Sequence, residues 1–176
     1  MRAARSSVLR AGAGAALGVL AIVPPAAAGP DPITIAVFDF ELADASASSG
    51  VIGKDAIDLE NLKEAAEVAR RMLSASGRYR VVDTSGVRGG VKGDIQDCRG
   101  CEAGLAWKAG ADQSMAGVVT RVGRTEHTVQ IVIRDSRTGD IVSNSFTGLR
   151  MGANYSWPRA VTWLMNNKVL PPQQAQ

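Results

Sequence analysis

Two cysteines, Cys98 and Cys101, are the residues whose type and spacing most directly suggest chemistry in this sequence. They stand three positions apart at the start of a predicted helix. In an oxidising compartment such a pair is expected to form a disulfide, which would close a small loop and act locally. A helix N-terminus also lowers the pKa of a thiol, so thiol–disulfide exchange is the alternative interpretation of the same pair.

Metal and haem chemistry fit this pair less well. Two cysteines provide half of a tetrahedral zinc site, and the single histidine, His127, lies far along the sequence. Covalent haem attachment requires a histidine directly after the second cysteine, where Glu102 stands instead. The sequence therefore predicts no metal ligand and no cofactor.

Acidic residues gather after the first predicted strand, where α/β proteins often bind ligands. Asp39, Glu41 and Asp44 lie there, but their spacing differs from that of a calcium-binding EF-hand loop. We interpret Asp39 and Glu41 as candidate contact residues, for a protein partner or for a small ligand. A solvated loop without a function is the simpler alternative.

Catalytic residues are not indicated elsewhere. His127 stands among polar residues at one end of a predicted strand, where a histidine is usually solvated. The sequence contains no Gly-x-Ser-x-Gly segment, the turn that exposes a nucleophilic serine in α/β hydrolases. We therefore predict no catalytic residue and expect that the chain is not an enzyme.

The first 28 residues have the pattern of a cleavable signal peptide. Three arginines precede an uncharged apolar run at 11–23, which two prolines and Ala26–Ala28 follow. The run is too short to span a bilayer, which takes about 20 residues. The pattern predicts export to the periplasm with no membrane span after cleavage; an uncleaved anchor is the alternative.

Removal of this segment changes the charge of the chain. The whole sequence has 20 basic and 17 acidic residues, and residues 1–28 contain three arginines and no acid. The mature chain therefore carries 17 groups of each sign. A neutral chain lacks the basic surface that nucleic-acid binding requires, so nucleic acid is not an expected partner.

The remaining chain is predicted to form a single α/β domain at residues 29–170, followed by a disordered tail at 171–176. Apolar runs and alternations predict five strands, at 33–40, 78–82, 113–122, 127–134 and 140–149. Helical periodicity predicts three helices, at 59–75, 101–109 and 157–169. The order β-α-β-α-β-β-β-α favours a mixed sheet with helices on its faces. The segments 41–58 and 84–97 are predicted to be loops.

Details of the helices follow from spacing and capping chemistry. In the helix at 59–75, five apolar residues recur every three or four positions and are predicted to share the buried face: Leu59, Leu62, Ala66, Ala69 and Leu73. Asp58 is expected to cap this helix, and Ser156 the last one. Trp157 and Trp163 of the last helix are expected at the core and at its rim.

Several segments together resemble the N-terminal α/β domain of TolB and the related domain of the curli secretion lipoprotein. These are residues 35–40, 76–83, 110–112 and 134–142. A more specific resemblance is to a secreted proteobacterial family of unknown function. It is carried by residues 38–42 and 97–102 and by four residues near the last helix: Arg150, Asn154, Ser156 and Trp157. The resemblance implies an exported α/β domain and marks these four residues as candidate interaction residues.

Together these features predict a non-enzymatic periplasmic accessory protein that binds another periplasmic protein. The expected contact surface combines the loop at 41–58 with the segment from Arg150 to Trp157. Two alternatives stay open, a thiol–disulfide redox protein that uses Cys98 and Cys101, and a small-ligand-binding protein.

Overall fold

The computed structural model describes residues 31–51, 53–87, 93–150 and 156–171. The predicted signal peptide, the candidate residue Asn154 and residues 172–176 of the predicted tail lie outside these ranges. Within them, no helix combines the length and the apolar character needed to cross a membrane.

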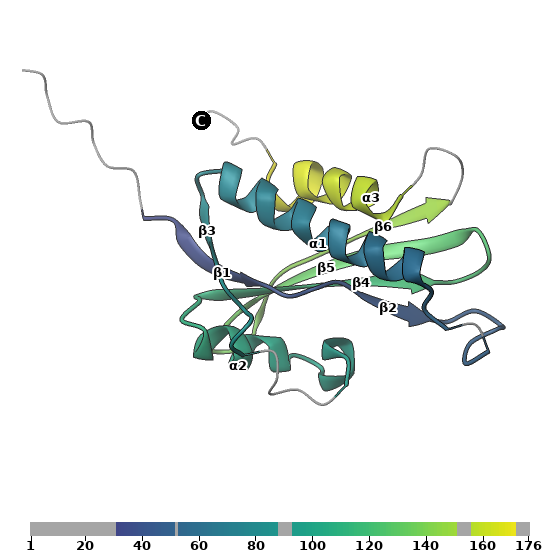
Figure 1. Ribbon diagram of the computed structural model, residues 1–176. Helices are drawn as coiled ribbons and strands as arrows, with labels where there is room; N and C mark the ends of the chain where they lie inside the picture. The colour runs from purple at the N-terminus through teal and green to yellow at the C-terminus, as the bar shows by residue number, and fades with distance from the viewer. Residues whose placement is uncertain (1–30, 52, 88–92, 151–155, 172–176) are drawn as a thin grey trace, which may run out of the picture.

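The described chain forms one mixed sheet of six strands with helices on both faces (Figure 1), which confirms the predicted class. The sheet order is β3-β1-β4-β5-β6, and β2 pairs with β4 beside β1. β1, β2, β3 and β4 pair in parallel, whereas β4, β5 and β6 pair antiparallel. The strands are β1 (Ile33–Val37), β2 (Glu41–Asp44), β3 (Tyr79–Val82), β4 (Gln113–Arg121), β5 (Glu126–Asp135) and β6 (Ile141–Arg150).

In the described ranges, three α-helices and two shorter helical segments accompany the sheet. The α-helices are α1 (Ala56–Ala75), α2 (Cys101–Lys108) and α3 (Trp157–Leu164). A 3₁₀ helix, η2 (Ile95–Cys98), precedes α2, and a π-helical turn, η3 (Met165–Val169), extends α3. Ser156 occupies the N-cap position of α3 as predicted, although its side chain makes no capping hydrogen bond.

The segment at 41–58, which was predicted to be a loop, contains a strand and the start of a helix. Its first four residues form β2, whose Leu42 is buried in the core, because pairing with β4 outweighs the loop-like composition. Its last residues begin α1 at Ala56. Asp55 caps this helix and Asp58 reaches back to the N-cap backbone in a capping box. Leu59 therefore falls on the exposed side of the first turn rather than on the buried face.

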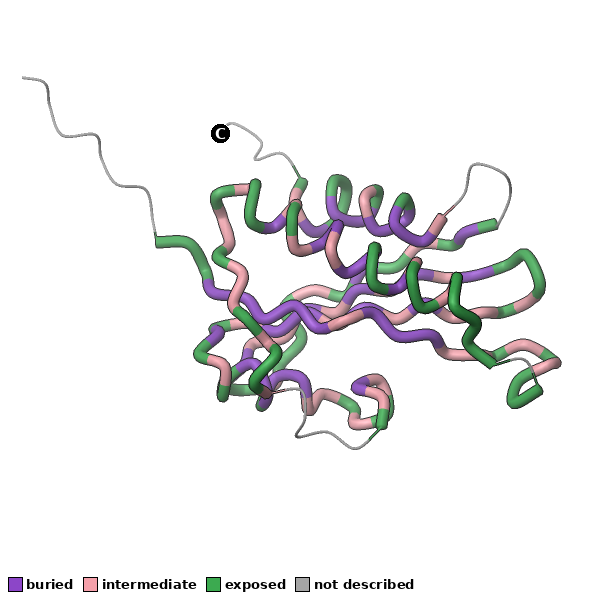
Figure 2. Tube along the Cα trace, viewed as in Figure 1, coloured by how far each residue is buried: buried purple, intermediate pink, exposed green. Residues whose placement is uncertain are grey.

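The two faces of the sheet are covered unequally. α1 and α3 lie side by side over one face and enclose the main core (Figures 1 and 2). On the opposite face, α2 and η2 cover a smaller cluster near β1 and the beginning of β4. That second layer stops short of the outer strands, so the faces of β5 and β6 turned away from α1 and α3 lack a helical cover among the described residues (Figure 1).

A close contact between Phe40 and Gly117 determines how the segment between β1 and β2 packs against β4. The buried ring of Phe40 lies against the backbone of Gly117, where a Cβ atom would overlap three carbon atoms of the ring. Glycine at this position thus lets an aromatic ring occupy the surface of a central strand. The contact belongs to the core that α1 and α3 cover.

Candidate functional site

The predicted disulfide joins Cys98 at the end of η2 to Cys101 at the start of α2, with Cα atoms 5.5 Å apart. Two residues with positive φ angles, Arg99 at 51° and Gly100 at 116°, turn the chain between the two helices. The carboxylate of Glu102 and both sulfur atoms lie within 4.8 Å of one another. Sulfur atoms joined in a disulfide are not the thiolates that bind metals, and Arg134 pairs with that carboxylate, Nε to Oε1, at 2.8 Å.

Glu41 holds this disulfide loop to the sheet. Its side chain is buried, and its two carboxylate oxygens accept hydrogen bonds from the backbone N–H groups of Ile95 (2.7 Å) and Gln96 (2.9 Å). These are the first N–H groups of η2, which have no partner within the helix. The structure therefore gives this predicted contact residue an anchoring role under the loop.

Replacement of Glu41 by alanine is expected to lower the free energy of unfolding by about 3 kcal/mol, because two charge-assisted hydrogen bonds are lost and the buried N–H of Ile95 is left without an acceptor. Urea unfolding of the mature protein measures the change. Glu60→Ala, at an exposed position of α1, is the control and is expected to change stability by less than about 0.5 kcal/mol. Equal losses in both variants would contradict the anchoring role.

Asp39 and Glu41 were predicted to form one acidic cluster, but their side chains bind groups on opposite sides of the sheet. Asp39 points toward α1, where its Oδ1 lies 2.7 Å from the Arg70 guanidinium. Arg70 also donates a hydrogen bond to the carbonyl of Val37 at 3.0 Å. Asp39 and Arg70 line a hollow of about 560 Å³ with the end of β3. The two acids thus do not form a single ligand site.

A polar cluster occupies the end of the molecule where β2 and β4 finish and α1 begins. Arg121 lies between two carboxylates, with its guanidinium nitrogens 3.4 Å from Asp44 and 2.7 Å from Asp58. All three side chains are largely buried. The single positive charge of the arginine offsets the repulsion between the two carboxylates, and the arginine ties the start of α1 to the ends of two strands.

His127 lies beside this cluster and is buried, which corrects the expectation of a solvated histidine. Its ring packs against the ring of Trp157, with centroids 5.7 Å apart. Burial lowers the pKa of His127 below 6.5, Arg121 lowers it further, and Asp58 and Asp44 partly oppose the shift. The prediction failed because β5 brings this strand end under the start of α3, which the local sequence does not reveal.

The stability of the protein is expected to fall as the pH drops below about 6.5, because the unfolded chain binds a proton at His127 before the folded chain does. Above that pH the histidine is neutral in both states and its contribution is complete. Urea unfolding at several pH values between 7.5 and 5 measures the loss. His127→Gln should show a smaller loss over the same range, and identical pH profiles would contradict this expectation.

The candidate residues around Trp157 divide into buried and exposed members. Trp157 is 2% exposed, and among the described residues its Nε1 and the His127 Nδ1 have no hydrogen-bond partner. Arg150, at the end of β6, is exposed and lies 3.5 Å from Glu126. Trp157 therefore belongs to the core as predicted, whereas Arg150 is available at the surface.

The uncovered face of the sheet continues into a groove beside the disulfide loop. The groove has a volume of about 380 Å³; its floor consists of apolar and polar residues from β2, β4 and β5, the polar ones being Thr120, Gln130 and Arg134, and residues of η2, α2 and the disulfide loop form its wall. The floor includes Ala43, Ala116, Val118 and Val132, and the wall includes the exposed Arg99. Beyond Gln130, whose side chain donates a hydrogen bond to Asn144 at 2.8 Å, lies Phe146 on β6, which is 71% exposed.

In the middle of β6, hydroxyl side chains point toward the core and large apolar side chains point toward solvent, an arrangement that was not predicted. Ser143, Ser145 and Thr147 face the helix-covered side, in register with core residues of β5, whereas Val142 and Phe146 are exposed. In a strand with one solvated face, apolar residues normally point inward. The alternation of the hydroxyl residues at 143, 145 and 147 with Val142, Asn144 and Phe146 was the available signal, but the sequence alone does not say which set points inward.

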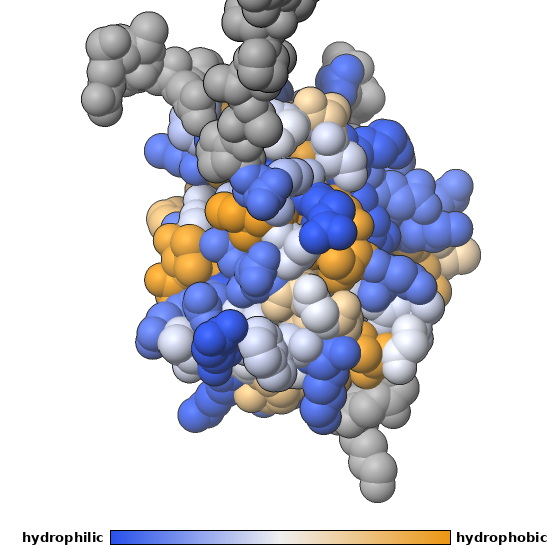
Figure 3. All heavy atoms as spheres, turned by 90° about the vertical axis from the view of Figure 1, so that its left-hand side faces the viewer, coloured by the Kyte–Doolittle hydropathy of each residue, from blue (hydrophilic) through white to orange (hydrophobic). Residues whose placement is uncertain are grey.

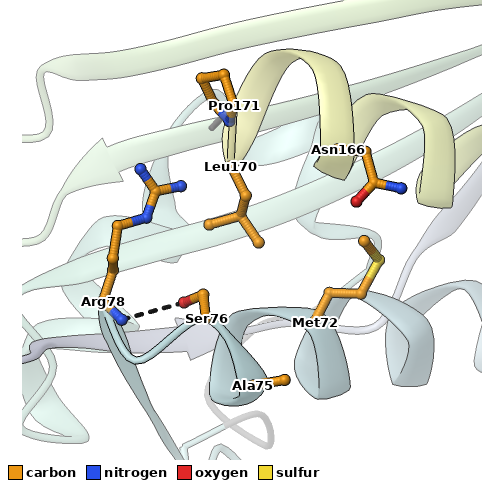
Figure 4. A pocket seen from close by; sticks show the side chains of 7 residues that line it. All are labelled: Met72, Ala75, Ser76, Arg78, Asn166, Leu170 and Pro171. Carbon is orange, nitrogen blue, oxygen red and sulfur yellow. Dashed lines mark hydrogen bonds between the residues drawn. The ribbon is translucent and has the colours of Figure 1, made fainter. Parts of the chain in front are cut away.

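A further hollow lies between the ends of α1 and η3, at the end of the molecule opposite the Arg121 cluster (Figure 4). Its volume is about 510 Å³, and it is lined by Met72, Ala75, Ser76, Arg78, Asn166, Leu170 and Pro171. Figure 3 shows hydrophilic and hydrophobic residues intermingled on this side. The guanidinium of Arg78 donates to the carbonyl of Val169 at 3.3 Å. The lining residues include no carboxylate, histidine or cysteine, and the hydroxyl of Ser76 donates a hydrogen bond to the carbonyl of Leu73 at 2.6 Å.

The sequence model of a family described as "Protein of unknown function (DUF2380)" matches residues 33–169. No curated protein matches the chain. Among solved structures, the chain is similar to the LpoB C-terminal domain from Escherichia coli, with 17% identity and a TM-score of 0.48 over 68% of this chain and 83% of that one.

Two other solved structures are similar in the same way. Lipoprotein GNA1162 from Neisseria meningitidis has 18% identity and a TM-score of 0.49, over 81% of this chain and 100% of that one. TolB from Acinetobacter baumannii has 14% identity and a TM-score of 0.39, over 70% of this chain and 24% of that one. These likenesses concern the fold alone.

Proposed function

The chain belongs to the DUF2380 family of proteins of unknown function, and we propose that it is an exported, non-enzymatic accessory protein that binds another periplasmic protein. The observation that carries this proposal is the uncovered face of the sheet. It presents apolar residues of three strands, interspersed with Thr120, Gln130 and Arg134, beside the disulfide loop and on the side opposite to the main core. A half-buried surface that combines apolar residues with polar ones is typical of protein interaction sites.

The chemistry of the groove defines the partner segment that would fit. Small and branched apolar side chains form part of the floor, so the segment brings apolar side chains of its own. Arg99 stands exposed on the wall, and the other arginine of the lining, Arg134, already pairs with Glu102. An acidic residue beside the apolar segment would therefore find its counter-ion at Arg99.

The disulfide serves this function as a brace for the groove wall. It closes a ring of four residues, and Glu41 anchors the same loop from below. Under the chain-entropy account, so short a ring contributes on the order of 2 kcal/mol at most. Its role is therefore local: it fixes the position of Arg99 relative to the floor.

Affinity capture with the tagged protein, expressed with its own N-terminal segment and cross-linked before lysis, tests the proposal. Wild type is expected to retain a specific envelope protein, and Arg99→Glu and Val118→Asp to lose it. Arg124→Glu changes an exposed arginine outside the groove lining and should retain it. The same captured proteins with all four chains would overturn the groove as the binding surface.

The mass of the protein recovered from the periplasmic fraction tests export. A chain that begins at Gly29 is expected, because the small residues Ala26–Ala28 precede that position. Recovery of the intact chain from the cytoplasm would contradict the proposal independently of the groove variants.

A further inference from the structure

The disulfide loop is attached to the rest of the protein on both sides of the S–S bond without its help. On the η2 side, the two carboxylate oxygens of Glu41 accept hydrogen bonds from the first N–H groups of η2 at 2.7 and 2.9 Å. On the α2 side, the buried carboxylate of Glu102 pairs with Arg134 at 2.8 Å. Both helical segments therefore stay in place on the sheet when the S–S bond is opened.

Arg99, inside the ring that the disulfide closes, is the residue that these contacts do not hold. Its φ of 51° and ψ of 43° lie in the left-handed region, and every other positive-φ residue of the described ranges is a glycine. A residue with a Cβ atom adopts this conformation only at a cost. The Arg99 side chain forms no hydrogen bond or ion pair with any described residue. Closure of the four-residue ring is therefore what keeps Arg99 in this conformation.

The two sulfur atoms are placed where a thiol can exchange with them. Both cysteines are half-buried rather than enclosed in the core. Disulfides that are exposed or that hold a strained turn are the ones that thiols reduce most readily. The Sγ of Cys98 lies 2.9 Å from the carbonyl oxygen of Ile95, which is an acceptor for the thiol that reduction produces. The folded protein thus accommodates the reduced pair as well as the oxidised one.

We propose that the bond between Cys98 and Cys101 is an exchangeable disulfide, which a dithiol of another protein reduces, and that reduction releases Arg99 from the groove wall while the fold stays intact. A thiolate of the dithiol attacks the Sγ of Cys98, the S–S bond breaks, and Cys101 leaves as a thiolate that the N-terminus of α2 stabilises. The second thiolate of the dithiol displaces Cys98 and closes a disulfide of its own. The dithiol loses two electrons and two protons, and the two cysteines become thiols.

Release of Arg99 changes the binding properties of the groove. Arg99 stands on the groove wall, where an acidic residue of the proposed partner would pair with it. A mobile arginine loses conformational entropy on binding that a fixed one has already lost, so the oxidation state of the disulfide sets the affinity of the groove. This consequence rests on the proposed function, whereas the release of Arg99 is a property of the protein alone.

Reduction of the purified mature protein by dithiothreitol, followed by alkylation and mass spectrometry, tests whether the ring holds Arg99 in the left-handed conformation. Glycine adopts this conformation without the cost that a Cβ atom brings, whereas alanine keeps the Cβ atom. Arg99→Gly should therefore favour the disulfide about threefold relative to Arg99→Ala, since the greater flexibility of glycine in the reduced loop offsets part of the gain. Equal equilibrium constants for the two variants would overturn the proposal.

Backbone nitrogen-15 relaxation of the oxidised and the reduced protein tests the release itself. The order parameter of the Arg99 N–H is expected to fall from about 0.85 to below about 0.6 on reduction with dithiothreitol. The N–H groups of Ile95 and Gln96 should keep theirs, because Glu41 still binds them. An unchanged order parameter at Arg99, or unfolding of the reduced protein, would contradict the inference.

Affinity capture with the Cys98→Ser/Cys101→Ser variant tests the consequence for the groove, because serine replaces the reduced pair without a reductant. This variant is expected to retain about tenfold less of the envelope protein than wild type, as for a lost hydrogen bond to a charged group. Equal capture would overturn control by the disulfide and leave the proposed function standing. Capture of nothing by wild type would overturn the proposed function, and the relaxation measurement would then decide the release of Arg99.

Discussion

Replacement of Gly117 by alanine is expected to lower the free energy of unfolding by about 3 kcal/mol, because a Cβ atom there would overlap the ring of Phe40. The ring is 3% exposed and is enclosed in the main core, so it has little room to move. The overlap also lies on a central strand, whose backbone is held by neighbours on both sides. Urea unfolding of the mature protein measures the loss.

The matched control for this change is Gly148→Ala, the same substitution in another strand of the same sheet. A Cβ atom at Gly148 would meet no atom within 4 Å. Its stability is expected to stay the same or to rise slightly, because alanine loses less backbone entropy than glycine on folding. A loss at Gly117 no larger than that at Gly148 would contradict the packing of Phe40 against β4.

Replacement of Trp157 by alanine is expected to cost about 3–5 kcal/mol of stability, because a fully buried aromatic side chain leaves a large cavity. The indole packs on the His127 ring and fixes the start of α3 against the sheet. The same variant is expected to bring the pKa of His127 closer to its ordinary value, since removal of the ring opens the site to water. Urea unfolding and the NMR titration of His127 measure the two effects.

Trp163 is the control for Trp157, since it lies on the same helix and is 47% exposed. Trp163→Ala is expected to cost less than about 1 kcal/mol and to leave the pKa of His127 unchanged. If both tryptophan variants lost the same stability, Trp157 would be a surface residue with an interaction role, as the family resemblance alone implies.

The sequence by itself determined those elements that follow from local patterns of residues. The hairpin of β5 and β6, the interior of α1 and the mixed sheet follow from the periodicity of apolar residues, which is set by the backbone geometry of each element. The disulfide also follows from local spacing, because Cys98 and Cys101 can meet only across the turn between them. The predicted signal peptide is of the same kind, and it still awaits its test.

The tertiary structure decided everything that depends on residues far apart in the chain. Glu41 meets Ile95 and His127 meets Trp157 only because the sheet brings those segments together. For the same reason Asp39 and Glu41, which are only two positions apart, bind groups on opposite faces of the sheet. The uncovered face of β6 arises because α2 ends before it reaches the outer strands. Periodicity shows that a strand has two faces, but only the packing of the other elements decides which face is covered.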